Sequence, residues 1–402
     1  MMKRLRYKLR QLFVVYRHEF YLTFHDGGIL LFFTFLPFIY PVLYSLIYNP
    51  EVVRDVKMVV VDHDMTASSR ELVRRMDATQ ETRIIGYAAD LNEGRRAMDS
   101  HACYAILEIP EGFERNIGNL ETGNAVMYCE MSLLLRYRGF LVAATNVAMD
   151  MGAEITTERI DELAPLAETL APGDMMPIGN VSLGNIENGF DSFIMPGIVI
   201  LILHQCLILA TCMAGGAKRE DPRLIGYRPI NEMPSVLMTM LGQMLCYMTI
   251  IYVPSIFLYH YVPMIFRFPV AGDPFAEMAF ILPMVLAALS LGFIIQGFVA
   301  QRESVFVFWV ITSVMFLFLS GLTWPRFAMP GFWKFVSDLI PATWGMEGFI
   351  RMNTNGSTLA QVRDPYIYLW IQAVVYFAIA YCVHRWVIRP KLRPFLKVSN
   401  VE

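Results

Sequence analysis

Phe193–Met213 reads FIMPGIVILILHQCLILATCM and contains no charged residue. A bilayer core about 30 Å thick needs about 20 apolar residues in helical form, because every backbone amide must find its partner within the segment. This run meets that requirement and predicts a helix that crosses a membrane. Five further runs qualify, approximately Ile29–Tyr48, Leu237–Tyr259, Ala276–Ala300, Ser304–Leu322 and Tyr366–Val383. The predicted fold class is a polytopic α-helical membrane protein with six transmembrane helices.

The composition of the whole chain agrees with a membrane protein. Of its 402 residues, 55% are apolar and 17% are charged, whereas roughly a quarter are charged in soluble domains. The net charge of -3 offers no basic excess for nucleic acid. The first apolar run starts far from the N-terminus and lacks a cleavage-site pattern, so we expect it to remain as an anchor.

The positive residues are concentrated in three segments, and these set the expected orientation. Loops rich in Lys and Arg are retained on the cytoplasmic side of a membrane. The segments are the N-terminus with Lys3, Arg4, Arg6, Lys8, Arg10 and Arg17, the loop after Met213 with Lys218, Arg219, Arg223 and Arg228, and the tail 385–402 with Arg385, Arg389, Lys391, Arg393 and Lys397. All three fall on one side if there are six spans. Both termini are then cytoplasmic, and residues 49–192 lie outside.

Residues 49–192 are predicted to form an inserted extracytoplasmic α/β domain. Apolar segments at 57–61, 82–87, 103–109 and 125–129 read as strands. They alternate with three predicted helices, of which the first begins near Ser68 and the others cover 91–99 and 112–120. This alternation indicates βαβ units and a small sheet. From about 133 to 170 the pattern is helical, and we expect a stalk that connects the domain to the membrane.

Two features of this domain leave alternatives open. Asp62-His63-Asp64 directly follows the first strand, where an Asp-rich turn is expected and a metal or catalytic site is the alternative. The six cysteines show neither CxxC nor CxxH spacing, which argues against a zinc site. Cys103 and Cys129 fall in predicted strands, and they are either disulfide-bonded or two separate buried thiols.

Amphipathic segments flank the predicted spans. In residues 1–28, Leu5, Leu9, Leu12, Phe13, Tyr16 and Phe20 recur at steps of three and four, and basic residues occupy another face. This pattern predicts a helix in the cytoplasmic interface, with a topogenic or a mechanical role. Residues 324–353 carry three Trp and three Pro and are too polar to span. We expect short helices there that dip into the outer leaflet without crossing it.

The sequence lacks the motifs of an enzyme or an ion-coupled carrier. GxxxxGK[ST], HExxH and GxSxG are all absent, so we expect no ATP site, catalytic residue, metal or cofactor in this chain. No Asp, Glu, Lys or Arg lies in the middle of a predicted span, where a proton or sodium relay would need one. The central polar residues are His204, Gln205, Gln243 and Gln296. They either join helices by hydrogen bonds or line a polar translocation path.

A transporter without its own ATP site needs a separate ATPase, and the loop at about 214–236 is the predicted docking surface. Its mixed charges are Lys218, Arg219, Glu220, Asp221, Arg223 and Arg228. The alternative is a solvated loop whose cations only set the topology.

Several motifs resemble those of the type 2 ABC permease family, in the branch with a large extracytoplasmic domain between the first and second spans. They are Ser320-Gly321 with Trp324-Pro325, Met329-Pro330, Pro341-Ala342-Thr343 and Gly348-Phe349-Ile350-Arg351. Glu220 stands where the family has the acid of its coupling helix. The Gly-Lys that often opens the third span in the family is Gly242-Gln243 here.

The resemblance implies a bacterial inner-membrane permease that works as an identical or related pair with two ATP-binding cassette subunits. ATP and Mg would bind to those partner chains. The resemblance also implies a periplasmic adaptor as a frequent companion and a drug-like or lipid-like amphiphile as a frequent cargo. The competing hypothesis is a membrane-anchored receptor or adhesion-type protein whose external domain binds a ligand.

Overall fold

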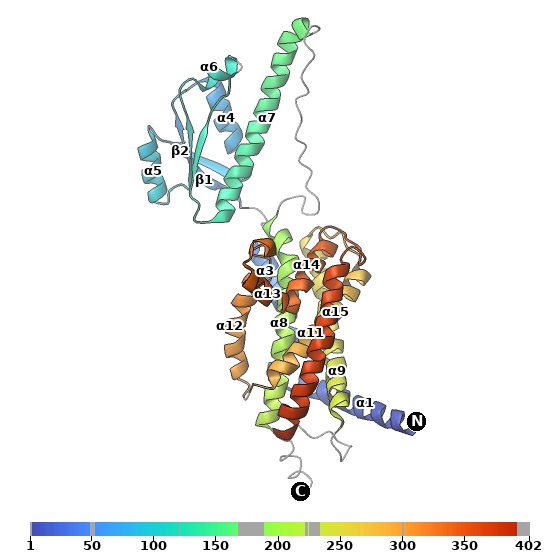
Figure 1. Cartoon of the computed structure of the whole chain (residues 1–402). Helices are drawn as coiled ribbons and strands as arrows, with labels where there is room; N and C mark the ends of the chain where they lie inside the picture. The colour runs from blue at the N-terminus through green and yellow to red at the C-terminus, as the bar shows by residue number, and fades with distance from the viewer. Residues whose placement is uncertain are drawn as a thin grey trace. The chain divides into compact units, whose positions relative to one another are not determined.

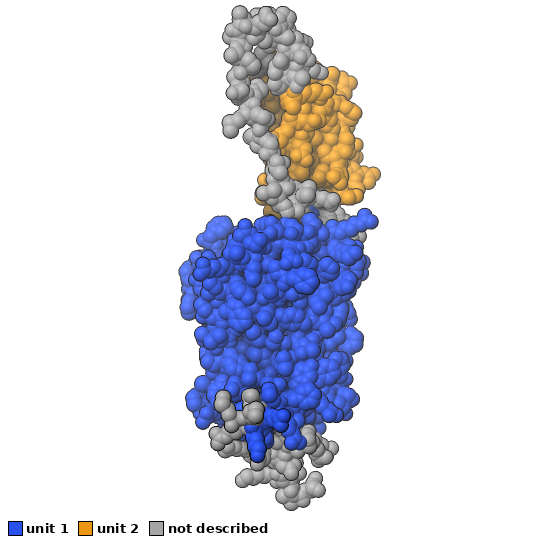
Figure 2. Space-filling view, turned by 90° about the vertical axis from the view of Figure 1, so that its right-hand side faces the viewer, with its two compact units in different colours: residues 1–49, 182–402 blue, residues 50–181 orange. Residues whose placement is uncertain are grey.

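The computed structural model describes residues 2–48, 53–119, 121–167, 189–221, 224, 234–299 and 301–391. The chain forms two compact units (Figure 2). Unit 1 comprises Met1–Asn49 and Ser182–Glu402, and unit 2 comprises Pro50–Val181.

Unit 1 is a bundle of apolar helices (Figure 1). Five segments are long and apolar enough to cross a membrane, namely Gly27–Tyr48, Phe190–Glu220, Val236–Phe266, Pro274–Gln296 and Arg363–Lys391. The first contains α2 (Gly27–Leu30), a π-helical turn (Leu31–Phe35) and α3 (Leu36–Tyr48); the second is α8 (Phe190–Glu220). The third contains α9 (Val236–Ile256), a π-helical turn (Phe257–Tyr261) and α10 (Val262–Phe266). The fourth is α11 (Pro274–Gln296). The fifth begins with α15 (Arg363–Val383), which is followed by a π-helical turn (His384–Ile388).

The remaining predicted span is shorter than expected. α12 (Ser304–Leu319) has 16 residues. At 1.5 Å per residue it measures about 24 Å, less than a bilayer core. It ends where Gly321 adopts a φ of 89°, a left-handed conformation that suits glycine and stops the helix. The structure thus contains five candidate spans and one short apolar helix among the described residues.

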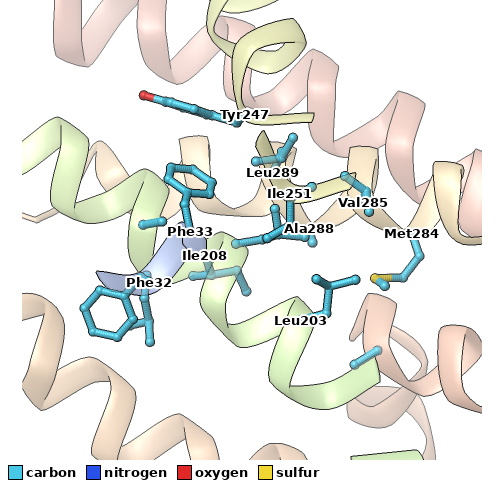
Figure 3. Packing of buried hydrophobic residues seen from close by; sticks show 14 of the residues in the cluster. Phe32, Phe33, Leu203, Ile208, Tyr247, Ile251, Met284, Val285, Ala288 and Leu289 are labelled. Atoms are coloured by element: carbon cyan, nitrogen blue, oxygen red, sulfur yellow. The ribbon is translucent and has the colours of Figure 1, made fainter. Parts of the chain in front are cut away.

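α8 lies at the centre of unit 1. Its apolar side chains point in all directions, which is the pattern of a helix surrounded by others. Figure 3 shows Leu203 and Ile208 of α8 packed among Phe33 of the first segment, Ile251 of α9 and Leu289 of α11.

Short elements follow α12. They are a 3-10 turn (Arg326–Ala328), α13 (Gly331–Asp338) and α14 (Pro341–Asn353). The Arg326 guanidinium lies 4.2 Å from the ring centre of Trp344 and forms ion pairs with Asp338 and Glu347. These contacts tie the turn to both short helices.

Unit 2 is a four-stranded sheet with helices on both faces. The strand order is β2-β1-β3-β4, for β1 (Val56–Asp62), β2 (Thr82–Tyr87), β3 (Ala105–Ile109) and β4 (Val126–Cys129). β1 is parallel to β2 and β3, and β4 is antiparallel to β3. α4 (Ala67–Asp77), α6 (Phe113–Gly118) and α7 (Leu134–Ala167) contribute to one apolar cluster, and α5 (Leu91–Asp99) packs in the other. These ranges overlap those expected from the alternating pattern.

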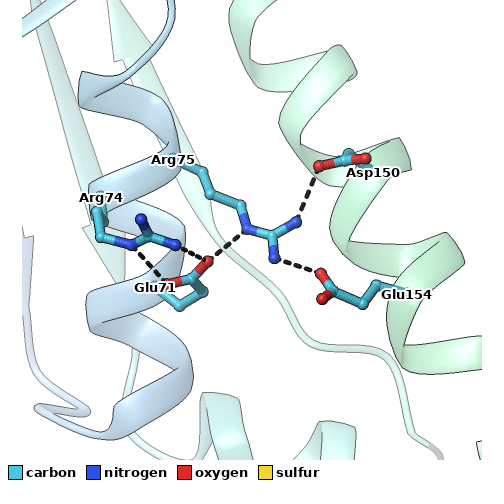
Figure 4. A network of polar contacts seen from close by, with 5 residues as sticks. All are labelled: Glu71, Arg74, Arg75, Asp150 and Glu154. Atoms are coloured by element: carbon cyan, nitrogen blue, oxygen red, sulfur yellow. Dashed lines mark hydrogen bonds and ion pairs between the residues drawn. The ribbon is translucent and has the colours of Figure 1, made fainter. Parts of the chain in front are cut away.

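A charged cluster joins α4 to α7 (Figure 4). Arg75 donates to Glu71 at 2.6 Å and to Asp150 at 2.9 Å, and it also pairs with Glu154. Asp150 and Glu154 are more than half exposed, so water screens these pairs and they orient α7 more than they stabilise it.

The open questions about the cysteines and the acidic triplet are answered by packing. Cys103 packs with Val59 and Ile106 in one cluster, whereas Cys129 packs against the other, and both are free thiols. Burial raises the pKa of the Cys129 thiol to about 11.

Asp64 accepts three backbone N–H groups at the start of α6, at 2.7, 3.1 and 3.0 Å, so its carboxylate is a helix cap.

Candidate functional site

α1 (Met2–His25) packs along α9 at the end of the bundle where α8 finishes (Figure 1). The two backbones approach closely at Gly242, where an added Cβ would lie 2.8 Å from the Val15 Cβ and 3.0 Å from the Leu12 carbonyl. Only glycine permits this approach. The helix predicted for residues 1–28 is therefore attached to the bundle by one of its faces.

Another face of α1 is exposed and apolar. Leu9, Phe13 and Phe20 are 55%, 64% and 40% exposed. These three residues of the predicted apolar stripe are exposed, whereas Tyr16 of the same stripe packs against the core of the bundle. Val15 and Leu22 are buried. This division suits a helix wedged between lipid and protein.

The buried face of α1 carries a fully buried carboxylate, Glu19. It forms an ion pair with Lys218 of α8, and the Lys218 side chain is 6% exposed. Gln243 donates to Glu19 Oε1 at 3.0 Å, and the Tyr247 hydroxyl donates to Oε2 at 2.8 Å. Burial opposes ionisation of Glu19, but the positive charge and hydrogen bond of Lys218 keep the pKa of this carboxyl below its ordinary value. Three helices, α1, α8 and α9, therefore meet at one charged and hydrogen-bonded group.

A second set of contacts lies at the last turn of α8. Arg302, between α11 and α12, pairs with Asp26, and its backbone N–H donates to Glu220 at 2.7 Å. Asp26 also caps α2 by accepting from the Gly28 N–H at 3.0 Å. Arg219 donates to the Gln296 carbonyl at 2.7 Å. We call Glu19, Asp26, Lys218, Glu220 and Arg302 the α8-end network.

The predicted coupling residues lie differently from their expected positions. Lys218, Arg219 and Glu220 belong to α8, which continues past the predicted boundary at 214 because each of them finds a partner within the bundle. Lys218 is buried and so is no exposed docking charge, whereas Glu220 and Asp221 are exposed. Arg223 and Arg228 lie outside the described residues.

The four residues proposed for a polar path are not brought together. Gln243 belongs to the Glu19 contacts, and Gln296 packs where a Cβ on Gly215 would meet its side chain at 2.1 Å. His204 is fully buried, and its ring lies edge-on to Phe316 with centroids 5.6 Å apart. Neither ring nitrogen of His204 has a hydrogen-bond partner among the described residues.

Gln205 lines a cavity. The cavity has a volume of about 280 Å³ and lies between the first apolar segment, α8 and α12. Gln205 accepts a hydrogen bond from the Trp309 indole N–H at 2.9 Å. The other side chains that line the cavity are largely apolar and include Phe32, Tyr40 and Leu317. An apolar cavity with a few placed polar groups suits an amphiphilic ligand.

Sequence reasoning missed Glu19, Asp26 and Arg302. Glu19 carried a usable signal, since it is the only acid within Met2–His25 and is spaced from Val15 and Leu22 by steps of four and three. The pairing of Asp26 with Arg302 joins residues 276 positions apart and had no local signal. Among the described residues, no group of three His, Cys, Asp or Glu side chains could hold a metal ion.

Comparison with known proteins places most of the chain in one family. The model of the ABC-2 family transporter protein matches residues 28–382. No curated protein matches the chain. The matched range covers most of the chain. It contains the second, third and fourth candidate spans and most of the first and fifth. The chain belongs to the ABC-2 family of transporter proteins.

Proposed function

We propose that this protein is the permease subunit of an ATP-driven exporter. Two permease chains, identical or related, would work with two ATP-binding cassette subunits, which bind ATP and Mg. Family membership supports the permease role. The α8-end network supports a mechanical link, because it joins α1, the start of α2, α8 and the α11–α12 turn through charged contacts.

The contacts of the α8-end network suggest how the ATPase would transmit movement to the permease. The segment that leaves α8 at Asp221 and returns at Ser235 is the proposed docking surface, and the exposed carboxylates of Glu220 and Asp221 stand at its start. A displacement of this segment would move α8, whose last turn is tied to α1 through Lys218 and to the α11–α12 turn through Glu220. Closure of the ATPases would thus reach several helices at once.

The cargo we propose is an amphiphile of the drug-like or lipid-like kind, and the cavity beside Gln205 supports it. Largely apolar walls would receive the apolar part of the cargo, while Gln205 and Ser313 would face its polar part. We further propose that the protein lies in a bacterial inner membrane, in contact with lipid, with both termini cytoplasmic and unit 2 outside, where a periplasmic adaptor would reach it.

Co-purification tests this function. The chain, solubilised in detergent from the cells that produce it, should bring down an ATP-binding cassette protein. Asp221→Arg should abolish the association while the unfolding transition of the permease stays unchanged, because Asp221 is exposed at the end of α8. Val307→Ser, at a lipid-exposed position of α12, is a matched control that should retain the ATPase. If the wild-type chain brings down no ATPase, the proposal is wrong.

A further inference from the structure

Unit 2 carries an exposed apolar loop at one end of its sheet. Met131 and Leu133 lie between β4 and α7, and Leu134 is the first residue of α7; they are 65%, 51% and 72% exposed. None of the three belongs to the apolar clusters that cover the two faces of the sheet. Neighbouring exposed apolar side chains mark a surface that contacts another apolar phase.

This loop lies at the amino end of β1. Glu130, directly before it, donates its backbone N–H to the Tyr104 carbonyl at 2.9 Å. Tyr104 in turn donates to the Lys57 carbonyl at 2.9 Å. Because neighbouring strands lie about 4.8 Å apart, two strand spacings place Glu130 about 10 Å from the start of β1.

The covalent chain limits how far the amino end of β1 can lie from the end of the first apolar segment. The first apolar segment ends at Tyr48, and Val53 already packs against an apolar cluster of unit 2. Five residues span at most about 17 Å when fully extended. The carboxyl end of β1 lies about 20 Å from its amino end. The constraint holds on whichever side of the bilayer unit 2 lies.

Exposed cations surround the loop. Arg54 and Lys57 lie at or just before the start of β1, and Arg138 lies in the first turns of α7, all three exposed. The acids beside them are the exposed Asp55 and the partly buried Glu130, which lies 3.8 Å from Arg136. Arg136 lies 3.9 Å from the ring centre of Tyr104 and holds the start of α7 against the sheet. Apolar side chains bordered by Lys and Arg are typical of surfaces that rest in the headgroup region of a bilayer.

We propose that Met131, Leu133 and Leu134 insert into the adjacent leaflet and rest unit 2 on the membrane. Lys57, Arg54 and Arg138 then face phospholipid phosphates. The partner is a lipid surface, and the proposal depends neither on the direction of transport nor on an ATPase.

Site-specific photocrosslinking tests this contact. A benzophenone amino acid replaces Leu134 in the full chain, reconstituted into vesicles of zwitterionic and anionic phospholipid that carry a clickable acyl chain. Met65 is the matched control, since it is 74% exposed and follows the opposite end of β1. We expect a lipid adduct from position 134 and none from position 65.

A second crosslinking position checks that the lipid adduct is not specific to residue 134. Replacement of Leu133 should give the same lipid adduct as replacement of Leu134, because both side chains belong to the exposed loop. Crosslinks from 133 and 134 to the helices of unit 1 or to a second copy, without a lipid adduct, would overturn the proposal. So would equal lipid labelling at positions 65 and 134.

Discussion

Removal of one partner of the Glu19–Lys218 pair should strongly destabilise unit 1. The side chains are 0% and 6% exposed, so solvent does not screen them. Loss of one partner of a buried pair costs about 3–5 kcal/mol, because an uncompensated charge stays behind. We expect Glu19→Gln to lower the free energy of unfolding by about 3 kcal/mol. Lys218→Met should cost about 3–5 kcal/mol, since the Glu19 carboxylate then keeps only Gln243 and Tyr247 as donors.

The double variant carries the decisive comparison. Glu19→Gln with Lys218→Met leaves no buried charge, so its loss should be about 3 kcal/mol rather than the sum of the two single losses. The coupling energy from the four chains is therefore expected to be about 3 kcal/mol. The assay is reversible unfolding in mixed detergent micelles. Arg75→Met in unit 2 is the control and should change little, because its partners Asp150 and Glu154 are largely exposed.

The pH dependence of the same chains gives an independent check. In the native chain the pKa of Glu19 is lowered, so its contribution is present above the unfolded value of about 4.3 and is lost as the pH falls through the folded pKa. In Lys218→Met, burial without a counter-charge raises the pKa, so stability should increase as the pH falls from neutral. Additive single losses, or equal pH slopes in the two chains, would refute the buried pair.

Further predictions concern packing, thiols and orientation. Gly242→Ala should destabilise the bundle by about 1–3 kcal/mol in the same assay, because its Cβ would press on Val15, whereas Gly152→Ala, with open space around it, should be neutral or stabilising; equal effects would contradict the close approach of α1 and α9. Mass spectrometry after alkylation should find Cys103 and Cys129 as thiols in unreduced protein, and a mass corresponding to a bond between them would contradict their packing in separate clusters. A topology reporter fused after Asn180 should report a position outside the cytoplasm, and one fused after Asp221 should report a position inside it. A cytoplasmic signal at Asn180 would contradict the proposed topology.

Hydropathy located the long apolar helices because a bilayer demands that each segment satisfy its own backbone. Helix ends were less accessible to this reasoning. The charges of Lys218 and Glu220 read as a loop, yet they extend α8 because Glu19 and Arg302 supply their partners from distant parts of the chain. Hydropathy alone also extended α12 beyond the left-handed Gly321 that follows its end.

The proposed polar path shows the limit of residue type as evidence. Gln205 and Gln243 look alike in sequence, but one lines a cavity and the other binds a buried carboxylate. Which role each takes depends on the helix it faces, and that is decided by packing between segments far apart in sequence. Spacing within α1, by contrast, could have identified Glu19 as a buried acid.

The central claim is that a separate ATPase drives this permease through the α8-end network. The most direct measurement is the ATP hydrolysis rate of the partner ATPase, alone and in proteoliposomes with the native chain, with Glu19→Gln or with Val307→Ser. We expect the native chain and Val307→Ser to change the rate and to couple it to export of an amphiphilic dye. Glu19→Gln, at a temperature where it remains folded, should bind the ATPase but lose this coupling. Equal hydrolysis rates with and without the native chain would contradict the account.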